Sequence, residues 1–426
     1  MVDTHLVILV HGVWGNSSHV SYLEKTINEE IKPTNGEKLF VYKTGSHSGY
    51  LTYDGIDVNG KRITDEILEQ TSILNSQGDK VTKFSIIGYS LGGLISRYAI
   101  GILHSRQYFE NIKPINFVTF CTPHIGVSNP QTQNFSVRLY NNIAPFFLAI
   151  TGSQFFLKDK VGEFNKPLLV WMADHNSKFY QALSNFKYKS LYANVVNDKR
   201  CSWFTSSISS DDPVNSMYNK SPKNIECSYI KGYEPNLIDY SKPLHFIQRD
   251  TKQINYDERP PIVRFFWKTL NWIKVIGSLI IYTPFWALSF LISSIFQRIK
   301  LSSRLRKFNN NTDNKLNHLY EYNEDTSFLT DLSNKFEDEQ DTLVEDMYNA
   351  MNYKVSHSKI FPKIKLDSNQ SFIVEKLNSI KWNKYPIILR HTTATHAAAI
   401  VRHADPNFDE GKVVVGHFID NVFKLE

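Results

Sequence analysis

The sequence predicts an α/β fold with a mostly parallel, doubly wound sheet, and two observations predict it. Runs of β-prone residues alternate with helical patterns from the N-terminus to about residue 120, which is the order that builds a parallel sheet covered by helices. One of these runs leads into Gly-x-Ser-x-Gly and then directly into a helical pattern. With 42% hydrophobic residues in 426, the chain can form one large domain with insertions, or two or three small ones.

The first elements follow this alternation. Leu6–Val10 is a continuous β-rich run, as expected for a buried parallel strand. After the polar residues 16–18, a helical pattern reaches to about Ile31. Leu39–Thr44 predicts a second strand, and Lys61–Leu74 carries apolar residues at helical spacing.

Residues Phe84–Leu94 carry the motif around which the chain is organised. A β-prone run enters Gly-Tyr-Ser-Leu-Gly at 88–92, and an apolar helical pattern begins at Leu91. A strand, a sharp turn with one serine and a helix together form a nucleophile elbow, which would place Ser90 in strained backbone angles. Gly88 and Gly92 lack side chains because the helix passes close to the strand. A glycine-rich turn without chemistry is the alternative.

A second loop is expected to complete the elbow. His11 and Gly12 follow the first predicted strand, where lipases and esterases keep the second donor of an oxyanion hole. The backbone N–H groups of Val13 and Leu91 are the expected donors to a negative oxygen that forms beside Ser90. An ordinary glycine turn is the alternative interpretation, and the downstream elbow favours the catalytic one.

The next strand, Ile115–Phe120, ends in Cys-Thr-Pro-His-Ile-Gly at 121–126, at the same edge of the sheet as the elbow. We interpret His124 as lining the site or shaping this loop, because it precedes any candidate acid in the chain. From about residue 129 to 188 the pattern becomes irregular and aromatic. This segment predicts a helical cap, whose aromatic residues either form its own core or line an acyl groove.

The candidate acid follows another strand, Leu191–Val196. Asp198 lies at the tip of this strand, which is a stiff platform for a carboxylate that orients a histidine and stabilises its cation. Asp211 and Asp212 are the rivals, and they fall in a loop rich in serine and proline. A turn aspartate without a catalytic role remains the alternative for Asp198.

An apolar insertion occupies residues 261–307, and Val275–Phe296 within it contains no charged residue. This length would span a membrane, but Pro284 near the middle would break a helix and allow a reversal. Basic residues flank both ends, and Trp267 and Trp272 lie at the margins of an amphipathic pattern. We expect a membrane-associated hairpin or interfacial helix, because a single crossing would separate the serine from any later histidine. Buried core helices are the alternative.

The chain is therefore expected to divide into four parts. Residues 1–260 form the first part of the core and include the cap at about 129–188, and residues 261–307 form the insertion. Residues 308–348 are an acidic, flexible linker, and residues 349–426 return to the core.

The returning segment contributes the candidate base. Residues 372–380 predict a helix or a strand, and residues 385–389 predict the last strand. In a Ser–acid–His order the histidine follows the last strands. We choose His396, because the three alanines after it allow tight packing beneath its ring. The competing histidines are His391, His403 and His417.

These motifs resemble the fungal putative serine esterase family, and within it the branch of yeast lipid-droplet phospholipases. The resemblance covers nearly the whole chain and rests on His11-Gly12, the elbow at 88–93, Thr122–Gly126, Leu191–Asn194 ahead of Asp198, and His396 followed by Ile400–Arg402. It implies an α/β-hydrolase fold and an enzyme that removes acyl chains from glycerophospholipids on droplets. Thr395 and Ala397-Ala398 depart from the family pattern around the histidine.

The expected function is hydrolysis of phospholipid or neutral-lipid acyl esters by a Ser90–Asp198–His396 triad, with no metal and no organic cofactor. A lipid acyltransferase with the same triad and an inactive membrane tether are the alternatives. The net charge of +6 is not gathered into a basic stripe, which argues against nucleic acid and favours an anionic membrane surface. Three cysteines without C-x-x-C spacing and no visible signal peptide predict a reducing compartment. The family resemblance implies lipid droplets or the cytosolic face of the endoplasmic reticulum.

Overall fold

The structure is a computed structural model. It describes residues 2–33, 36–130, 135–162, 165–198, 200–212, 225–242, 245–246, 283–310 and 364–426. The chain divides into two compact units, one formed by residues 1–246 and 348–426 and the other by residues 247–347.

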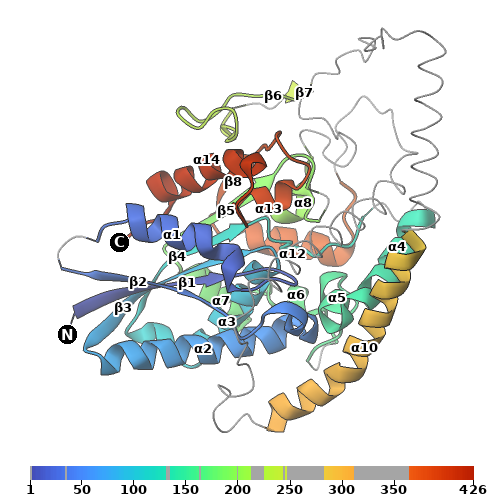
Figure 1. Cartoon of the computed structure of the whole chain (residues 1–426), viewed down its shortest axis with the longest axis horizontal. Helices are drawn as coiled ribbons and strands as arrows, with labels where there is room; N and C mark the ends of the chain where they lie inside the picture. Colours follow the sequence, from blue (N-terminus) through green and yellow to red (C-terminus); the bar gives the residue numbers. More distant parts are fainter. Residues whose placement is uncertain are drawn as a thin grey trace. The chain divides into compact units, whose positions relative to one another are not determined.

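A six-stranded sheet with the order β2-β1-β3-β4-β5-β8 forms the centre of the first unit (Figure 1). Its strands are β1 (Val2–Val10), β2 (Lys38–Lys43), β3 (Asp79–Tyr89), β4 (Lys113–Phe120), β5 (Tyr188–Asn194) and β8 (Asn383–Ile387). Every neighbouring pair runs parallel, so the predicted parallel sheet is confirmed. Because β8 runs parallel to β5, its carboxyl end lies at the same edge of the sheet as the carboxyl ends of the other strands.

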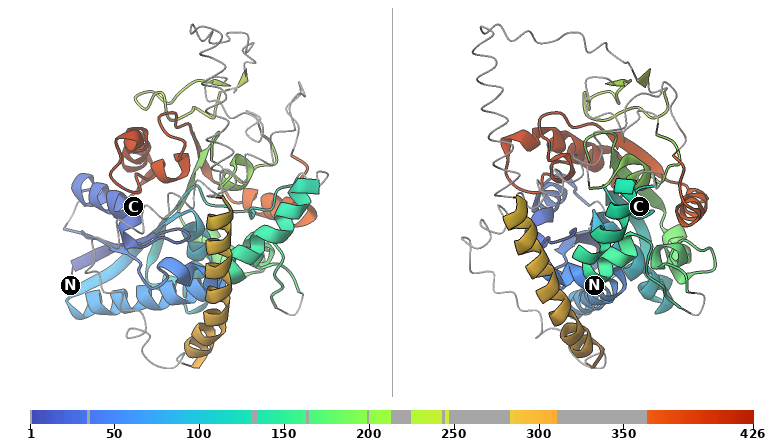
Figure 2. Two further views of the ribbon diagram at one scale, coloured as in Figure 1. Left: turned by 45° about the vertical axis from the view of Figure 1, so that its right-hand side comes forward. Right: turned by 90° about the vertical axis from the view of Figure 1, so that its right-hand side faces the viewer.

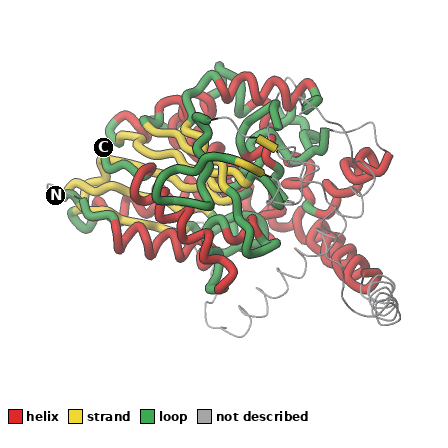
Figure 3. Tube along the Cα trace, turned by 90° about the horizontal axis from the view of Figure 1, so that it is seen from above, coloured by secondary structure: helices red, strands yellow, loops and turns green. Residues whose placement is uncertain are grey.

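Helices cover both faces of this sheet, as a doubly wound fold requires (Figures 1 and 2). In β1, Leu6 and Ile8 point into one hydrophobic cluster while Val7 and Leu9 point into the other. Both faces of the strand are thus buried, which explains its continuous apolar run. The chain termini lie near each other at the side where the strands begin (Figure 3), and Lys424 O accepts a hydrogen bond from Asn116 at the start of β4.

The helices of the first unit have the following bounds. The first face packs against α2 (Ile56–Ser76), α3 (Leu91–Ser105), α7 (Lys178–Asn185) and α12 (Ser368–Asn378), and the second against α1 (Ser21–Glu30) and α14 (Asp409–His417). The shorter helices are η1 (Ser17–Val20), η2 (Gly49–Asp54), η3 (Tyr108–Glu110), α8 (Trp203–Ser206), α13 (Thr395–Ala398), η7 (Pro406–Phe408) and η8 (Phe418–Val422), and β6 (Ile225–Glu226) pairs with β7 (His245–Phe246).

The segment expected to form a cap contains α4 (Phe135–Phe147), α5 (Ala149–Phe155), α6 (Leu168–Trp171) and α7. Helices α4 and α5 lie beyond the carboxyl ends of the strands (Figure 1). Thr151 of α5 donates through Oγ1 to Thr52 O at 2.5 Å, and Gln154 Oε1 accepts from Ile56 N at 2.6 Å. These bonds fix α5 to the core. Phe156, at the end of α5, is buried in the main core.

Of the apolar insertion, the structure describes only α10 (Thr283–Asn310), the helix of the second unit. Pro284 is its second residue, where proline is compatible with a helix start. The helix extends beyond residue 307, the expected end of the insertion. Among the residues that the structure describes, no helix has the length and apolar character needed to cross a membrane. Trp267, Trp272 and the acidic stretch after α10 lie outside the described residues.

Burial lowers the pKa of five of the buried histidines of the first unit: His5, His11, His47, His124 and His417. Burial, followed by the charge of Lys83, lowers the pKa of His5 to about 3. Burial lowers the pKa of His47 and of His417 to about 4, and it lowers the pKa values of His11 and His124 well below their usual range. These rings are neutral at neutral pH.

We predict that the free energy of unfolding falls as the pH drops from about 6.5 to about 4. The unfolded chain protonates these histidines near pH 6.5 and the folded chain does not. The buried neutral histidines therefore contribute fully to the free energy of unfolding above pH 6.5. Below pH 6.5, each histidine lowers the free energy of unfolding by about 1.4 kcal/mol per pH unit. Urea melts at several pH values measure this slope. His5→Gln should reduce this slope by the share that corresponds to one proton. Equal free energies of unfolding at pH 7 and pH 5.5 would contradict the prediction.

Candidate active site

Ser90 lies at the tight turn between β3 and α3, with φ 54° and ψ −125°. These angles are strained for a residue with a side chain. A Cβ on Gly88 would lie 2.4 Å from Gly93 Cα, and one on Gly92 would lie 2.2 Å from Val10 O. Only glycines allow α3 to pass this closely, so the predicted strand–turn–helix arrangement is present and its glycines have the predicted steric role.

The end of β4 fixes the backbone of the serine. Ser90 N donates to Phe120 O at 2.9 Å, and Thr122 Oγ1 donates to Ser90 O at 2.9 Å. Thr122 also packs against Gly93, where an added Cβ would lie 2.1 Å from Thr122 Oγ1. The strained turn is therefore held from the neighbouring strand, and Ser90 cannot relax without breaking these contacts.

The loop after β1 lies directly against Ser90. A Cβ on Gly12 would be 2.8 Å from Ser90 Cβ and 3.3 Å from its Oγ. Val13 follows this glycine, and Leu91 is the first residue of α3. Within the described ranges, the N–H groups of Val13 and Leu91 have no hydrogen-bond acceptor in the protein. Both donors are thus available to an oxygen beside Ser90, as an oxyanion hole requires.

Two neutral histidines stiffen this loop. His11 Nδ1 donates to Gly12 O at 3.0 Å, and the ring stacks on His47 with centroids 3.8 Å apart. His47 Nε2 in turn donates to His11 O at 3.3 Å. Because burial keeps both rings uncharged, they fill space beneath the loop without adding a positive charge. His11 therefore shapes the loop that bears Val13.

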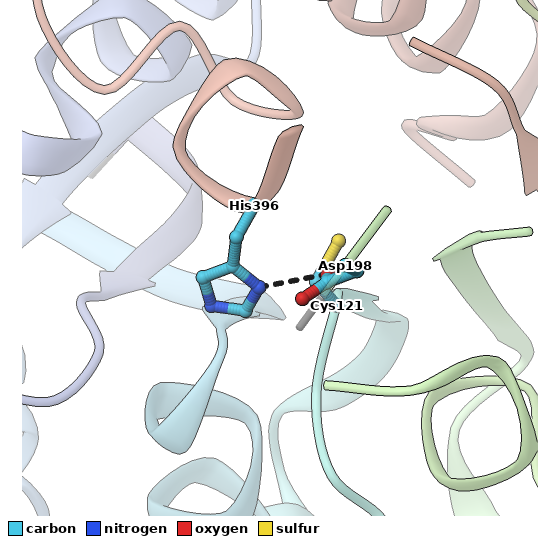
Figure 4. Close-up of side chains that lie close together, drawn as sticks. All are labelled: Cys121, Asp198 and His396. Carbon is cyan, nitrogen blue, oxygen red and sulfur yellow. Dashed lines mark hydrogen bonds and ion pairs between the residues drawn. The ribbon is translucent and has the colours of Figure 1, made fainter. Parts of the chain in front are cut away.

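Asp198 and His396 meet at the carboxyl edge of the sheet (Figure 4). His396 Nδ1 donates to Asp198 Oδ2 at 2.9 Å, and both side chains are buried. The His396 ring packs on Tyr89, the residue before Ser90, with centroids 5.1 Å apart, and Tyr89 Oη donates to His396 O. In the part of the chain that is described, His396 Nε2 is buried and has no hydrogen-bond partner. This nitrogen is free to accept a proton.

Asp198 is held as a carboxylate. It accepts hydrogen bonds from Asn194 Nδ2 at 3.1 Å, Arg200 N at 3.1 Å and Cys201 N at 2.8 Å, besides the one from His396. Burial alone would raise the pKa of this carboxyl, but His396 and the other donors outweigh burial and hold the pKa below its usual value. An ionised Asp198 fixes the His396 tautomer and stabilises its cation.

The rival residues lie elsewhere or have other partners. His391 is exposed, His403 packs on Phe408 with centroids 4.8 Å apart, and His417 Nδ1 pairs with Tyr192 Oη at 2.8 Å. His124 is fully buried, and its Nε2 lies 3.0 Å from Thr119 Oγ1. The residue paired with His396 is Asp198, and not Asp211 or Asp212.

Asn194 is a site residue to which the sequence patterns gave no role, although it ends the Leu191–Asn194 motif. Its Nδ2 donates to Asp198 Oδ2, and it also lies 3.4 Å from Cys121 Sγ and 3.4 Å from Thr395 O. It thereby connects β5, the end of β4 and the segment that bears His396. The available signal was its place as the last residue of a strand just before the acid, but an asparagine there is equally typical of an ordinary turn.

One group of potential metal ligands occurs among the described residues, formed by Cys121, Asp198 and His396, whose donor atoms lie within 4.8 Å of one another (Figure 4). Burial and the nearby Asp198 raise the pKa of the Cys121 thiol well above its usual value, so the thiol stays protonated. The carboxylate and His396 Nδ1 are already hydrogen-bonded to each other. Since a metal needs deprotonated, available donors, this group fits a hydrogen-bond network better than a metal site.

We predict that a fluorophosphonate probe labels Ser90 covalently in the folded protein. The free Nε2 of His396 and the two open N–H groups favour attack by Ser90 on phosphorus. Ser90→Ala should abolish labelling, and His396→Ala should slow it by about 1000-fold or more. Gel fluorescence and peptide mass spectrometry measure both. The matched control His391→Ala should label like the unmodified chain, and labelling of Ser90 that is indifferent to His396→Ala would refute the assignment of the base.

Comparison with known proteins finds a matching family and several relatives of this chain. Residues 2–211 match the family described as "Putative serine esterase (DUF676)". "Putative lipase C4A8.10" of Schizosaccharomyces pombe is 30% identical over 201 residues, which are 46% of this chain and 25% of the relative. "Putative lipase YDL109C" of Saccharomyces cerevisiae is 31% identical over 209 residues, which are 48% of this chain and 30% of the relative.

The matched part thus spans a quarter to a third of the length of these relatives. Among solved structures, phospholipase PlaB from Legionella pneumophila is similar over 50% of this chain and 43% of its own, with 13% identity and a TM-score of 0.28. Residues 2–211, which carry Ser90 and Asp198, thus match the putative serine esterase family that the motifs led us to expect.

Proposed function

We propose that this chain is a serine hydrolase that cleaves the acyl esters of lipids, with glycerophospholipids as its main substrates. One observation carries the proposal. His396 donates through Nδ1 to a buried carboxylate while its Nε2 is unpartnered beside the turn that bears Ser90. This is the state that a general base for a serine needs. The match to a serine esterase family and the names of the lipase relatives support the same reaction class.

In the proposed mechanism, His396 Nε2 takes the proton of Ser90 as Oγ attacks the ester carbonyl. The carbonyl oxygen becomes an oxyanion that accepts hydrogen bonds from Val13 N and Leu91 N. Loss of one such donor lowers the catalytic rate by about 100-fold or more. His396 then protonates the departing alcohol, and the acyl group remains bound to Ser90 as an ester. Water, deprotonated by His396, releases the fatty acid and restores the enzyme.

We further propose that the insertion holds the enzyme on a lipid surface. This surface is either a lipid droplet or the cytosolic face of the endoplasmic reticulum membrane. Helix α10 supports this through its side chains. Leu288, Ile292 and Ile299 are 56%, 58% and 68% exposed, and their spacing places them on one helical face. The C-terminal half of the helix carries the basic residues Arg298, Lys300, Arg304 and Arg306. An exposed apolar face with basic residues is typical of an interfacial helix, and Trp267 and Trp272 would add interfacial anchors.

We predict that the purified chain releases fatty acid from phospholipid in mixed micelles. Ser90→Ala should lower the rate by about 10⁴-fold or more, because it removes the nucleophile. Ser105→Ala, an exposed serine at the end of α3, is the matched control and should keep full activity. Assays of separate lipid classes with mass spectrometry of the products measure this. Release from triacylglycerol alone would overturn the phospholipid assignment, and transfer of the acyl chain to an added alcohol in place of water would identify an acyltransferase.

Deletion of residues 262–300 is predicted to move the protein from the membrane fraction to the soluble fraction. The deletion removes the apolar surface that would hold the protein at lipid. Flotation of cell lysates measures the distribution, and hydrolysis of a short-chain soluble ester reports whether the core remains folded. Ser90→Ala should remain membrane-bound. If the deleted protein still floats with membranes, the anchor lies elsewhere in the chain.

A further inference from the structure

Helix α4 carries a row of exposed apolar side chains that nothing in the proposed mechanism uses. Phe135 is 72% exposed, Leu139 48%, Ile143 46% and Phe146 38%. Steps of four, four and three residues place these side chains on one face of a helix. We call them the α4 stripe. Four large apolar side chains in one row form a patch of the kind that marks an interaction surface.

The opposite face of α4 is anchored, so the stripe cannot turn inward. Val137 is 4% exposed. Asn141 exchanges two hydrogen bonds with the backbone of Asn129, accepting from its N–H at 3.0 Å and donating to its carbonyl at 2.8 Å. A Cβ on Gly152 of α5 would lie 2.2 Å from Pro145 O, so the backbones of the two helices are in contact. The fold itself presents the stripe outward.

The charges around the stripe favour one occupant. Between residues 127 and 158 the only charged side chains are Arg138 and Lys158, and the segment contains no carboxylate. Arg138 is exposed on α4, next to Leu139 in the chain. An apolar helical face with basic and without acidic residues complements an anionic lipid surface, into which the apolar side chains insert while the cations meet the headgroups.

The stripe is connected to the catalytic edge through a short length of chain. Residues 122–126 lead from β4 toward α4, and Val127 N donates to Phe155 O at the end of α5. Thr122, at the other end of this stretch, holds the Ser90 carbonyl. Helices α4 and α5 lie beyond the carboxyl ends of the strands (Figure 1). A surface bound through α4 would therefore face the edge of the sheet that carries Ser90.

We propose that the α4 stripe is a docking surface for a phospholipid layer that contains anionic lipids. It is distinct from the insertion and belongs to the catalytic unit itself. The benefit of docking rests on the proposed function, because docking at this edge brings the ester bonds of the lipid layer toward Ser90. Contact between the stripe and lipid follows from exposure and charge alone, and it is testable separately from catalysis.

The test uses the full chain and the double substitution Leu139→Gln with Ile143→Gln. Both side chains are about half exposed, so the fold is retained. The matched control is Val2→Gln with Ile73→Gln, which also replaces two exposed apolar residues, 44% and 39% exposed. Binding is measured by co-sedimentation with vesicles of phosphatidylcholine and phosphatidylserine. We expect about tenfold weaker binding for the α4 variant and no change for the control. Equal binding of the two variants would overturn the proposal.

A second measurement reports directly on the surroundings of one residue of the stripe. An environment-sensitive fluorophore on Leu139→Cys should shift to the blue on addition of the vesicles, whereas the same fluorophore on Ile73→Cys should not. An unshifted Leu139→Cys probe refutes docking through α4. If the α4 variant only converts a dimer into a monomer, the stripe contacts a second copy and the lipid assignment is wrong.

Hydrolysis of a short-chain soluble ester separates the two claims. The α4 variant should hydrolyse it at the rate of the unmodified chain, because no residue of the stripe belongs to the catalytic set. A chain that binds vesicles through Leu139 and cleaves no soluble ester would refute the proposed function and leave the docking surface standing.

Discussion

The hydrogen bond between Asp198 and His396 joins segments that are 198 residues apart, and the candidate site depends on it. Pairing of β8 with β5 brings the C-terminal segment back to the sheet, and Asn194 then connects the acid with the backbone before the histidine. Because both side chains are buried, their attraction is stronger than in water. The same burial would penalise either partner without the other.

Backbone crowding around Ser90 supplies the other half of the site. Gly12, Gly88 and Gly92 each lie where a side chain would overlap a neighbouring strand, helix or the serine itself. The positions of Val13 N and Leu91 N are therefore set by contacts between main chains, which do not depend on side-chain rotamers. Donors fixed in this way need little reorganisation when charge develops, and this preorganisation is the main source of catalysis by an oxyanion hole. The strained Ser90 backbone costs about 1–3 kcal/mol.

Local patterns were enough to predict the sheet and the elbow, because continuous apolar runs and closely spaced glycines act through neighbours in the chain. They left residues 372–380 open between helix and strand. The structure has α12 there, begun by a capping box between Asp367 and Gln370, which lies just before the stretch considered. The role of Asn194 depends on contacts with Cys121 and Thr395, which are far from it in the chain. The outward direction of the α4 stripe depends on which face of α4 is anchored, through Asn141 and the contact with Gly152. No periodicity in the sequence encodes such contacts.

The most direct test is a crystal structure of the chain with a phosphonate bonded to Ser90 Oγ. We expect the phosphonyl oxygen to lie about 2.7–3.1 Å from both Val13 N and Leu91 N. We also expect His396 Nε2 within hydrogen-bond reach of Ser90 Oγ, with Nδ1 still bound to Asp198. A phosphonyl oxygen that contacts neither N–H group, or a His396 ring bonded away from Asp198, would contradict the proposed site.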